Sequence, residues 1–228
     1  MIRRKLSLLK TRIVVATRDF GIKHTILRML QDGLLSKFFL FRQYIIYEKQ
    51  LPKENLPELR NPHLEFTFIS PDDNETLEKI EQLSGLSHDM VTEKIRNGGE
   101  CVVARDNDKL AGFNLVSIGK AHVRYLDAYL NLSQIEAWSE QITVAPEFRK
   151  GGLATDIRHK MFERLVKRGY EKLIGGYVPF NQKSAGLAKK LGFVEREKFT
   201  LIRIIIWKKL YSRTLSSNII GELALAFQ

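Results

Sequence analysis

The stretch that decides the fold lies at residues 142–154 and reads Ile-Thr-Val-Ala-Pro-Glu-Phe-Arg-Lys-Gly-Gly-Leu-Ala. Its β-branched start predicts a strand that ends at Pro146, and two glycines follow. From Leu153 to Leu165 an apolar residue recurs every four positions, which predicts a helix over residues 152–168. The stretch is therefore a strand, a glycine loop and a helix in succession.

Such a loop is suited to bind an anion. The N–H groups of the loop and of the first helical turn have no intrahelical acceptor, so they can donate to a pyrophosphate at the positive end of the helix dipole. Glycine allows close approach because it has no Cβ, and Arg149 and Lys150 add positive charge. An ordinary strand-to-helix turn is the alternative interpretation of the same residues.

A second segment, residues 181–193, reads Asn-Gln-Lys-Ser-Ala-Gly-Leu-Ala-Lys-Lys-Leu-Gly-Phe. Asn181 is a good N-cap, and Gly192 suits the left-handed position after a helix. The segment therefore predicts a short capped helix over residues 182–191.

Both segments resemble the GNAT (Gcn5-related N-acetyltransferase) family. Arg149, Gly152 and Ala154 match its Arg/Gln-x-x-Gly-x-Gly/Ala element, and residues 181–193 match its Asn-x-x-Ala/Ser-x-x-Leu-x-x-x-x-Gly-Phe segment. The resemblance covers about residues 64–208. It implies an α/β fold of the GNAT type, a central twisted, mostly antiparallel mixed sheet flanked by helices, here with an N-terminal basic extension.

The resemblance also implies an acyl-CoA-dependent N-acyltransferase, with acetyl-CoA or another acyl-CoA as co-substrate and no metal. The acceptor expected is a primary amine of a small metabolite or an amino sugar. In the family the loop amides hold the coenzyme A pyrophosphate and the preceding strand binds the pantetheine arm. The cofactor-binding residues implied are Ile142, Thr143, Val144, Arg149, Lys150, Gly151, Gly152, Leu153, Ala154, Asn181 and Ser184.

Glu140 is the first candidate for the general base, because it lies on the strand that leads to the loop. Strict alternation places Trp138, Glu140, Ile142 and Val144 on one face, where apolar neighbours would raise the pKa of the carboxyl. A salt-bridged or solvent-facing glutamate is the alternative, and Glu136 is the second candidate.

The general acid common in the family has no direct match in this sequence. Family members often carry a tyrosine right after the leucine of the second segment, but this chain has Ala188 there. Tyr177, on the preceding strand, is the candidate substitute, although a packed aromatic is the favoured interpretation of that residue. Two alternatives to the acetyltransferase stay open: a non-catalytic acyl-CoA sensor, and a long-chain N-acyltransferase at the membrane surface.

The pattern along the chain predicts three parts: a basic N-terminal extension over residues 1–60, the acyltransferase domain over 61–211, and a tail over 212–228. In the extension we expect a helix near residues 25–35 and a strand near 38–47. In the domain we expect helices near 72–83 and 88–96, strands near 64–69, 101–105, 110–117, 135–144 and 172–178, and strand material over 193–207. Residues 106–109 read as a hairpin turn.

Charge and composition narrow the partners. The chain of 228 residues has a net charge of +11, and residues 1–60 hold 13 Lys and Arg against 5 Asp and Glu. Contact of residues 1–50 with an anionic membrane is one interpretation; packing against the main sheet or a homodimer contact is the favoured one. Nucleic acid is the weakest candidate, because no nucleic-acid-binding pattern accompanies the charge. We expect a cytoplasmic protein, with membrane association as the alternative.

Other candidate residues carry less information. The single cysteine, Cys101, lies in an apolar run and is expected to be a core thiol. We expect His159 to be a surface residue, whereas His88 and His122 stay open as candidates to flank an acceptor cleft, with no recognisable partner in the sequence. The acceptor is expected between residues 72–98 and 123–134, where the candidate lining residues are Tyr125, Asp127 and Tyr129.

Overall fold

The computed structural model describes residues 39–52, 57–204, 207–215 and 225–226, together with positions 14, 17 and 22. The helix predicted near residues 25–35 lies outside the described residues. The described chain divides into two compact units: residues 49–121 with 132–174, and residues 39–48 and 122–131 with those from Gly175 onward. The three-part division expected from the sequence stays a prediction.

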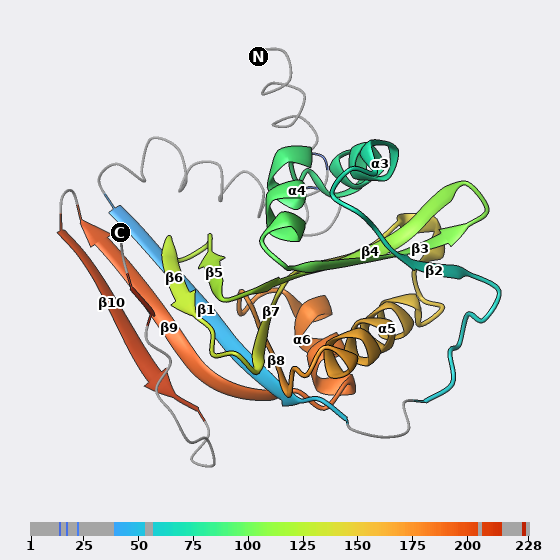
Figure 1. The fold of residues 1–228 in the computed structure, drawn as a ribbon. Coiled ribbons are helices and arrows are strands. Elements are labelled where there is room, and N and C mark those ends of the chain that lie inside the picture. The colour runs from blue at the N-terminus through green and yellow to red at the C-terminus, as the bar shows by residue number, and fades with distance from the viewer. Residues whose placement is uncertain are drawn as a thin grey trace. The chain divides into compact units, whose positions relative to one another are not determined.

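The first unit is built on a mixed sheet (Figure 1). Its strands in spatial order are β2 (Glu65–Phe68), β3 (Glu100–Asp106), β4 (Lys109–Ile118), β7 (Glu136–Val144) and the start of β8 (Lys172–Tyr177). All neighbouring pairs are antiparallel except β7 and β8, which are parallel. The predicted hairpin joins β3 to β4, and Asn107 takes the left-handed conformation there with a φ of 52°.

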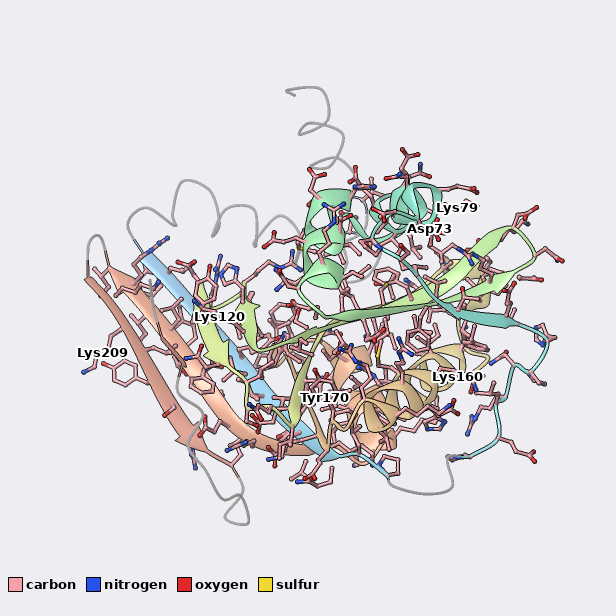
Figure 2. All side chains as sticks on the ribbon, in the orientation of Figure 1. Asp73, Lys79, Lys120, Lys160, Tyr170 and Lys209 are labelled. Atoms are coloured by element: carbon pink, nitrogen blue, oxygen red, sulfur yellow. The ribbon has the colours of Figure 1, made fainter. Side chains whose placement is uncertain are left out.

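Helices cover both faces of this sheet, as expected for the fold. Helices α3 (Asn74–Ser84) and α4 (His88–Arg96) lie on one face, and α5 (Leu153–Lys167) lies on the other (Figure 1). Lys79 on α3 and Lys160 on α5 mark the two helix layers (Figure 2). Among the described helices, none is long and apolar enough to cross a bilayer.

Burial of apolar side chains explains why these helices form. The predicted face of α5 is confirmed, since Leu153, Ile157, Met161 and Leu165 are all at most 2% exposed. On the opposite face a core cluster packs α3 and α4 against β3 and β4; it contains Ile69, Leu77, Ile80, Leu86, Val91, Cys101, Val103, Phe113 and Leu115. Cys101 is the core thiol expected, and burial raises its pKa.

The second unit contains β1 (Phe39–Gln50), β9 (Val194–Ile204), β10 (Trp207–Thr214) and α6 (Gln182–Lys190). β9 pairs antiparallel with both β1 and β10. The predicted strand of the N-terminal extension is therefore a member of a sheet. The strand material predicted over residues 193–207 is divided between two strands, because β9 ends at Ile204 and Trp207 pairs back with it as the start of β10.

A small three-stranded sheet was not predicted from the sequence. It consists of β5 (Lys120–Val123), β6 (Ala128–Asn131) and β11 (Leu225–Ala226). Each strand has at most four residues, too few to show a clear alternation.

Aromatic side chains of β1 divide between surface and interior. Phe39 and Phe41 are 53% and 45% exposed, whereas Tyr47 is buried and packs edge-on against Phe193 with 4.8 Å between ring centroids. The Tyr47 side chain is therefore not available for contact with a membrane. Membrane contact by this part of the chain stays a prediction.

Candidate active site

The loop between β7 and α5 presents a row of backbone donors. After the 3-10 turn Pro146–Phe148, Lys150 and Gly152 adopt φ values of 74° and 85°, and Gly152 is the N-cap of α5. Thr155 N and Asp156 N donate to the carbonyl of Gly152. Within the described part of the chain, the N–H groups of residues 151–154 have no acceptor. This arrangement fits an anion.

A free strand edge leads to this loop. β7 pairs with β8 at three positions, Glu136 to Trp138, and its later residues pair only with β4 among the described strands. The Val144 carbonyl accepts a 3.2 Å hydrogen bond from Arg149 Nε, and the other backbone groups of residues 139–144 on that side remain available to a ligand that lies along the strand. Contact of Ile142, Thr143 and Val144 with a pantetheine arm stays a prediction, and the edge is compatible with it.

A β-bulge interrupts β7 at Glu140. Leu115 is opposite Gln141 and Val116 is opposite Ser139, so Glu140 is an extra residue in the strand. The bulge overturns the predicted alternation. Glu140 faces α4, whereas Val144 lies opposite Gly112, where an added Cβ would contact Ile157 of α5. Glu140 and Val144 thus lie on opposite faces of the sheet.

The carboxylate of Glu140 is anchored through one oxygen. Its Oε1 lies 2.8 Å from Lys94 Nζ and accepts a 2.6 Å hydrogen bond from Ser117 Oγ. The Glu140 side chain is 5% exposed and that of Lys94 is 18% exposed, so the ion pair is largely buried. The prediction of apolar surroundings for Glu140 is wrong. The alternative, a salt-bridged glutamate, is confirmed. Oε2 makes no hydrogen bond or ion pair with any residue that the structure describes.

Glu136, the second candidate base, lies at the start of β7. Its Oε2 accepts a hydrogen bond from Ser133 N at 3.0 Å, and its Oε1 lies 3.6 Å from Lys172 Nζ. Burial raises the pKa of Glu136, but the hydrogen bonds from Ser133 and the charge of Lys172 outweigh it and lower the pKa overall. A carboxyl with a lowered pKa is a weaker base, so Glu136 is the poorer candidate.

Two residues that sequence reasoning missed hold the loop from outside. Asp156, 1% exposed, accepts hydrogen bonds from Arg60 N at 3.2 Å and from Asn61 N and Nδ2 at 2.9 and 2.7 Å. Asn61 Nδ2 also donates to the carbonyl of Gly151 at 3.1 Å. The sequence feature that could have predicted this contact is Asp156 itself, because a carboxylate directly before the apolar Ile157, in the buried first turn of the helix, needs hydrogen-bond donors.

In the second unit, the two predicted site residues of α6 cap their own helix. Asn181 Oδ1 accepts a hydrogen bond from Ser184 N at 3.2 Å, and Asn181 Nδ2 donates to Ser184 Oγ at 2.8 Å. The capped helix predicted from the sequence is confirmed. Cofactor contact by these two residues stays a prediction.

Tyr177 is a packed aromatic, as the favoured interpretation had it. It is 6% exposed and clusters with Tyr47 and Ala188. Its hydroxyl donates to Glu195, and burial together with this hydrogen bond raises its pKa. A phenol with a raised pKa releases its proton less readily, so the arrangement disfavours Tyr177 as the general acid. That role stays a prediction.

The histidines have partners that the sequence did not reveal. His88 Nε2 lies 3.0 Å from Asn74 Oδ1, and His122 stacks on Tyr129 at 4.6 Å between centroids. The predicted surface position of His159 is wrong: it is 8% exposed, and burial lowers its pKa. No group of three or more His, Cys, Asp and Glu in the described chain is arranged to hold a metal.

Two candidate acceptor residues have contacts within the second unit. The Arg42 guanidinium lies 5.1 Å above the Tyr125 ring, and Arg42 Nη1 donates to the carbonyl of Tyr125 at 2.9 Å. Asp127 pairs with Lys208 at 3.1 Å, and the hydrogen bond from that ammonium is the main cause of its lowered pKa. Acceptor binding by Tyr125, Asp127 and Tyr129 stays a prediction.

The segment that contains this strand, the glycine loop and the helix matches a known protein family. The model of the acetyltransferase (GNAT) family matches residues 56–193. The chain belongs to the GNAT acetyltransferase family. A search of curated proteins found no match.

Solved structures of GNAT proteins share this fold. A protein described as a GNAT-family acetyltransferase, from Novosphingobium aromaticivorans, has a TM-score of 0.51 at 16% identity, over 70% of this chain and 62% of that one. A Gcn5-related N-acetyltransferase from Sphaerobacter thermophilus has a TM-score of 0.51 at 14% identity, over 82% and 56%. A glucosamine N-acetyltransferase region of a fungal β-N-acetylglucosaminidase has a TM-score of 0.55 at 15% identity, over 77% and 22%. This GNAT chain therefore spans less than two thirds of the length of each of these structures.

Proposed function

We propose that this protein is an acyl-CoA-dependent N-acetyltransferase that moves an acetyl group from acetyl-CoA to a primary amine of a small metabolite or an amino sugar. Family membership supports acyl transfer in general. The fungal structural relative is described as a glucosamine N-acetyltransferase, which supports an amino sugar as the first acceptor class to test.

The observation that carries the proposal is the row of N–H groups at residues 151–154, which have no acceptor among the described residues and follow a strand whose edge is unpaired by any described strand. A pyrophosphate accepts hydrogen bonds from such a row, and an extended amide-containing arm pairs with such an edge. Coenzyme A carries both features. Arg149 and Lys150 add positive charge beside the loop, so the residues present fit the group.

Bound acetyl-CoA supplies an acyl group activated as a thioester. Glu140 is the residue of β7 suited to take the proton of the acceptor ammonium. Lys94 and Ser117 hold its Oε1, which fixes the carboxylate, while Oε2 has no hydrogen bond or ion pair with the described residues. A fixed carboxylate with one oxygen available acts as a general base without paying further ordering entropy.

The test is calorimetric titration with acetyl-CoA of wild type, Ala154→Glu and Ala154→Gln. Ala154 lies in the first turn of α5, where a carboxylate is tolerated by the helix dipole but repels a phosphate. We expect the Glu variant to weaken binding about a hundredfold and the isosteric Gln variant to weaken it far less. Equal binding by both variants would refute the loop as the phosphate site. A panel of amino sugars and small amines then tests turnover through release of free thiol.

A second candidate function is a non-catalytic acyl-CoA sensor. Ala188 is 7% exposed within the cluster of Tyr47 and Tyr177, so the position of the family tyrosine is filled by packing rather than by a free hydroxyl. Tight binding of acetyl-CoA without thiol release from any amine in the panel would favour the sensor. Turnover of any amine at a rate above the uncatalysed reaction would exclude it.

A further inference from the structure

The segment before β2 is tied to the glycine loop. Asp156 accepts the backbone N–H groups of Arg60 and Asn61, and Asn61 Nδ2 bridges from the same carboxylate to the carbonyl of Gly151. Because Asp156 is 1% exposed, this anchor is shielded from water and holds residues 60 and 61 firmly. We call residues 57–63 the strap.

The anchor holds the backbone of Arg60 beside the loop, and the Arg60 side chain lies against Gly152. A Cβ added at Gly152 would come 2.6 Å from Arg60 Cδ and 3.5 Å from both Nε and Nη1. The Gly152 N–H is also one of the four donors at residues 151–154 that have no acceptor among the described residues. The guanidinium therefore lies beside the donors on which the proposed phosphate site depends.

The Arg60 side chain is suited to bind an anion. It is exposed, and its guanidinium makes no hydrogen bond or ion pair with any residue that the structure describes. The nearby carboxylate of Asp156 is already occupied by the two backbone N–H groups and the Asn61 amide. A guanidinium binds a phosphate with two parallel hydrogen bonds and a full positive charge, and the neutral N–H groups of the loop do not supply that charge.

We propose that Arg60 is a phosphate-binding residue of this protein and that the strap delivers it to the pyrophosphate of coenzyme A. The inference rests on the proposed function, because it deepens the same site. The pyrophosphate is assigned rather than the 3′-phosphate of the adenosine because Arg60 lies against Gly152, within the row of amides. Asn61 and Asp156 are positioning residues that act through Arg60 and the loop.

The side chain of Arg60 can be changed without breaking the anchor, because only its backbone N–H contacts Asp156. Arg60→Gln is therefore the test variant. The control is Lys167→Gln, which removes one positive charge from the last turn of α5, about 20 Å from the loop along the helix axis. Both variants are expected to keep the melting temperature of wild type.

The experiment is calorimetric titration of the three proteins with coenzyme A and with dephospho-coenzyme A, which lacks only the 3′-phosphate. We expect Arg60→Gln to weaken both ligands by the same factor, about tenfold, and Lys167→Gln to change neither. Loss of affinity for coenzyme A alone would assign Arg60 to the 3′-phosphate and overturn the proposal. Unchanged affinity for both ligands, with binding still sensitive to Ala154→Glu, would remove Arg60 from the site and leave the proposed function intact. If wild type bound neither ligand, the proposed function itself would fail.

Discussion

The buried ion pair between Lys94 and Glu140 allows a sharp test of how β7 is held. The Lys94 ammonium and the Glu140 carboxylate are 2.8 Å apart, on side chains that are 18% and 5% exposed. Replacing Lys94 by Met leaves the carboxylate buried with only the Ser117 hydroxyl, which should cost about 3 kcal/mol of unfolding free energy. Replacing Glu140 by Gln keeps an acceptor for Ser117 and leaves a partly exposed ammonium, which should cost about 2 kcal/mol.

The double variant separates pairing from mere packing. With both charges gone, no charge is left buried, so we expect Lys94→Met/Glu140→Gln to be no less stable than Lys94→Met alone and the coupling energy to be about 2 kcal/mol. Urea unfolding followed by tryptophan fluorescence measures all four proteins, since Trp138 lies two residues from Glu140 on β7. Equal m-values would show that the unfolded states are comparable. Costs that add within about 0.5 kcal/mol would mean that the two charges do not interact and would refute the reasoning.

Four further predictions concern the same region and its neighbours. Glu140→Gln should lower kcat about a hundredfold or more with the affinity for acetyl-CoA unchanged, and a wild-type kcat would exclude Glu140 as the base. Gly112→Ala should lower the melting temperature, because its Cβ would lie 2.7 Å from Thr143 O and 2.9 Å from Ile157 Cδ1; wild-type stability would contradict this. Ala188→Tyr should destabilise the protein by about 1–3 kcal/mol in urea unfolding, since the position is packed against Tyr47 and Tyr177, and a gain in turnover without loss of stability would show that the cluster has room. Burial lowers the pKa of folded His159, so the unfolded chain takes up the proton more readily and stability should fall as pH drops below about 6.5. Melting curves at several pH values should show a smaller fall for His159→Leu, and parallel curves for the two proteins would count against it.

The sequence was most informative where local chemistry and fold agree. The four-residue apolar repeat of α5, the cap at Asn181 and the turn around Asn107 each depend on residues close in the chain, so each could be predicted from the pattern. The two family segments carried the fold class in the same way. Predictions failed where one extra residue shifts the two-residue alternation of a strand. The bulge at Glu140 reverses the alternation of β7, and no residue type from Trp138 to Val144 indicates a bulge.

What the sequence by itself determined is the family, the order of the helices and longer strands from β2 to α6, and the glycine loop before α5, because these follow from periodicity and from residue types at short spacing. Only the tertiary structure decided that Glu140 is paired with Lys94, that His159 is buried, and that Arg60 lies beside Gly152. These contacts join residues 46 to 92 positions apart, or depend on which helix face meets the sheet. A single sequence records each partner but not the distance between them, and that distance is set by packing.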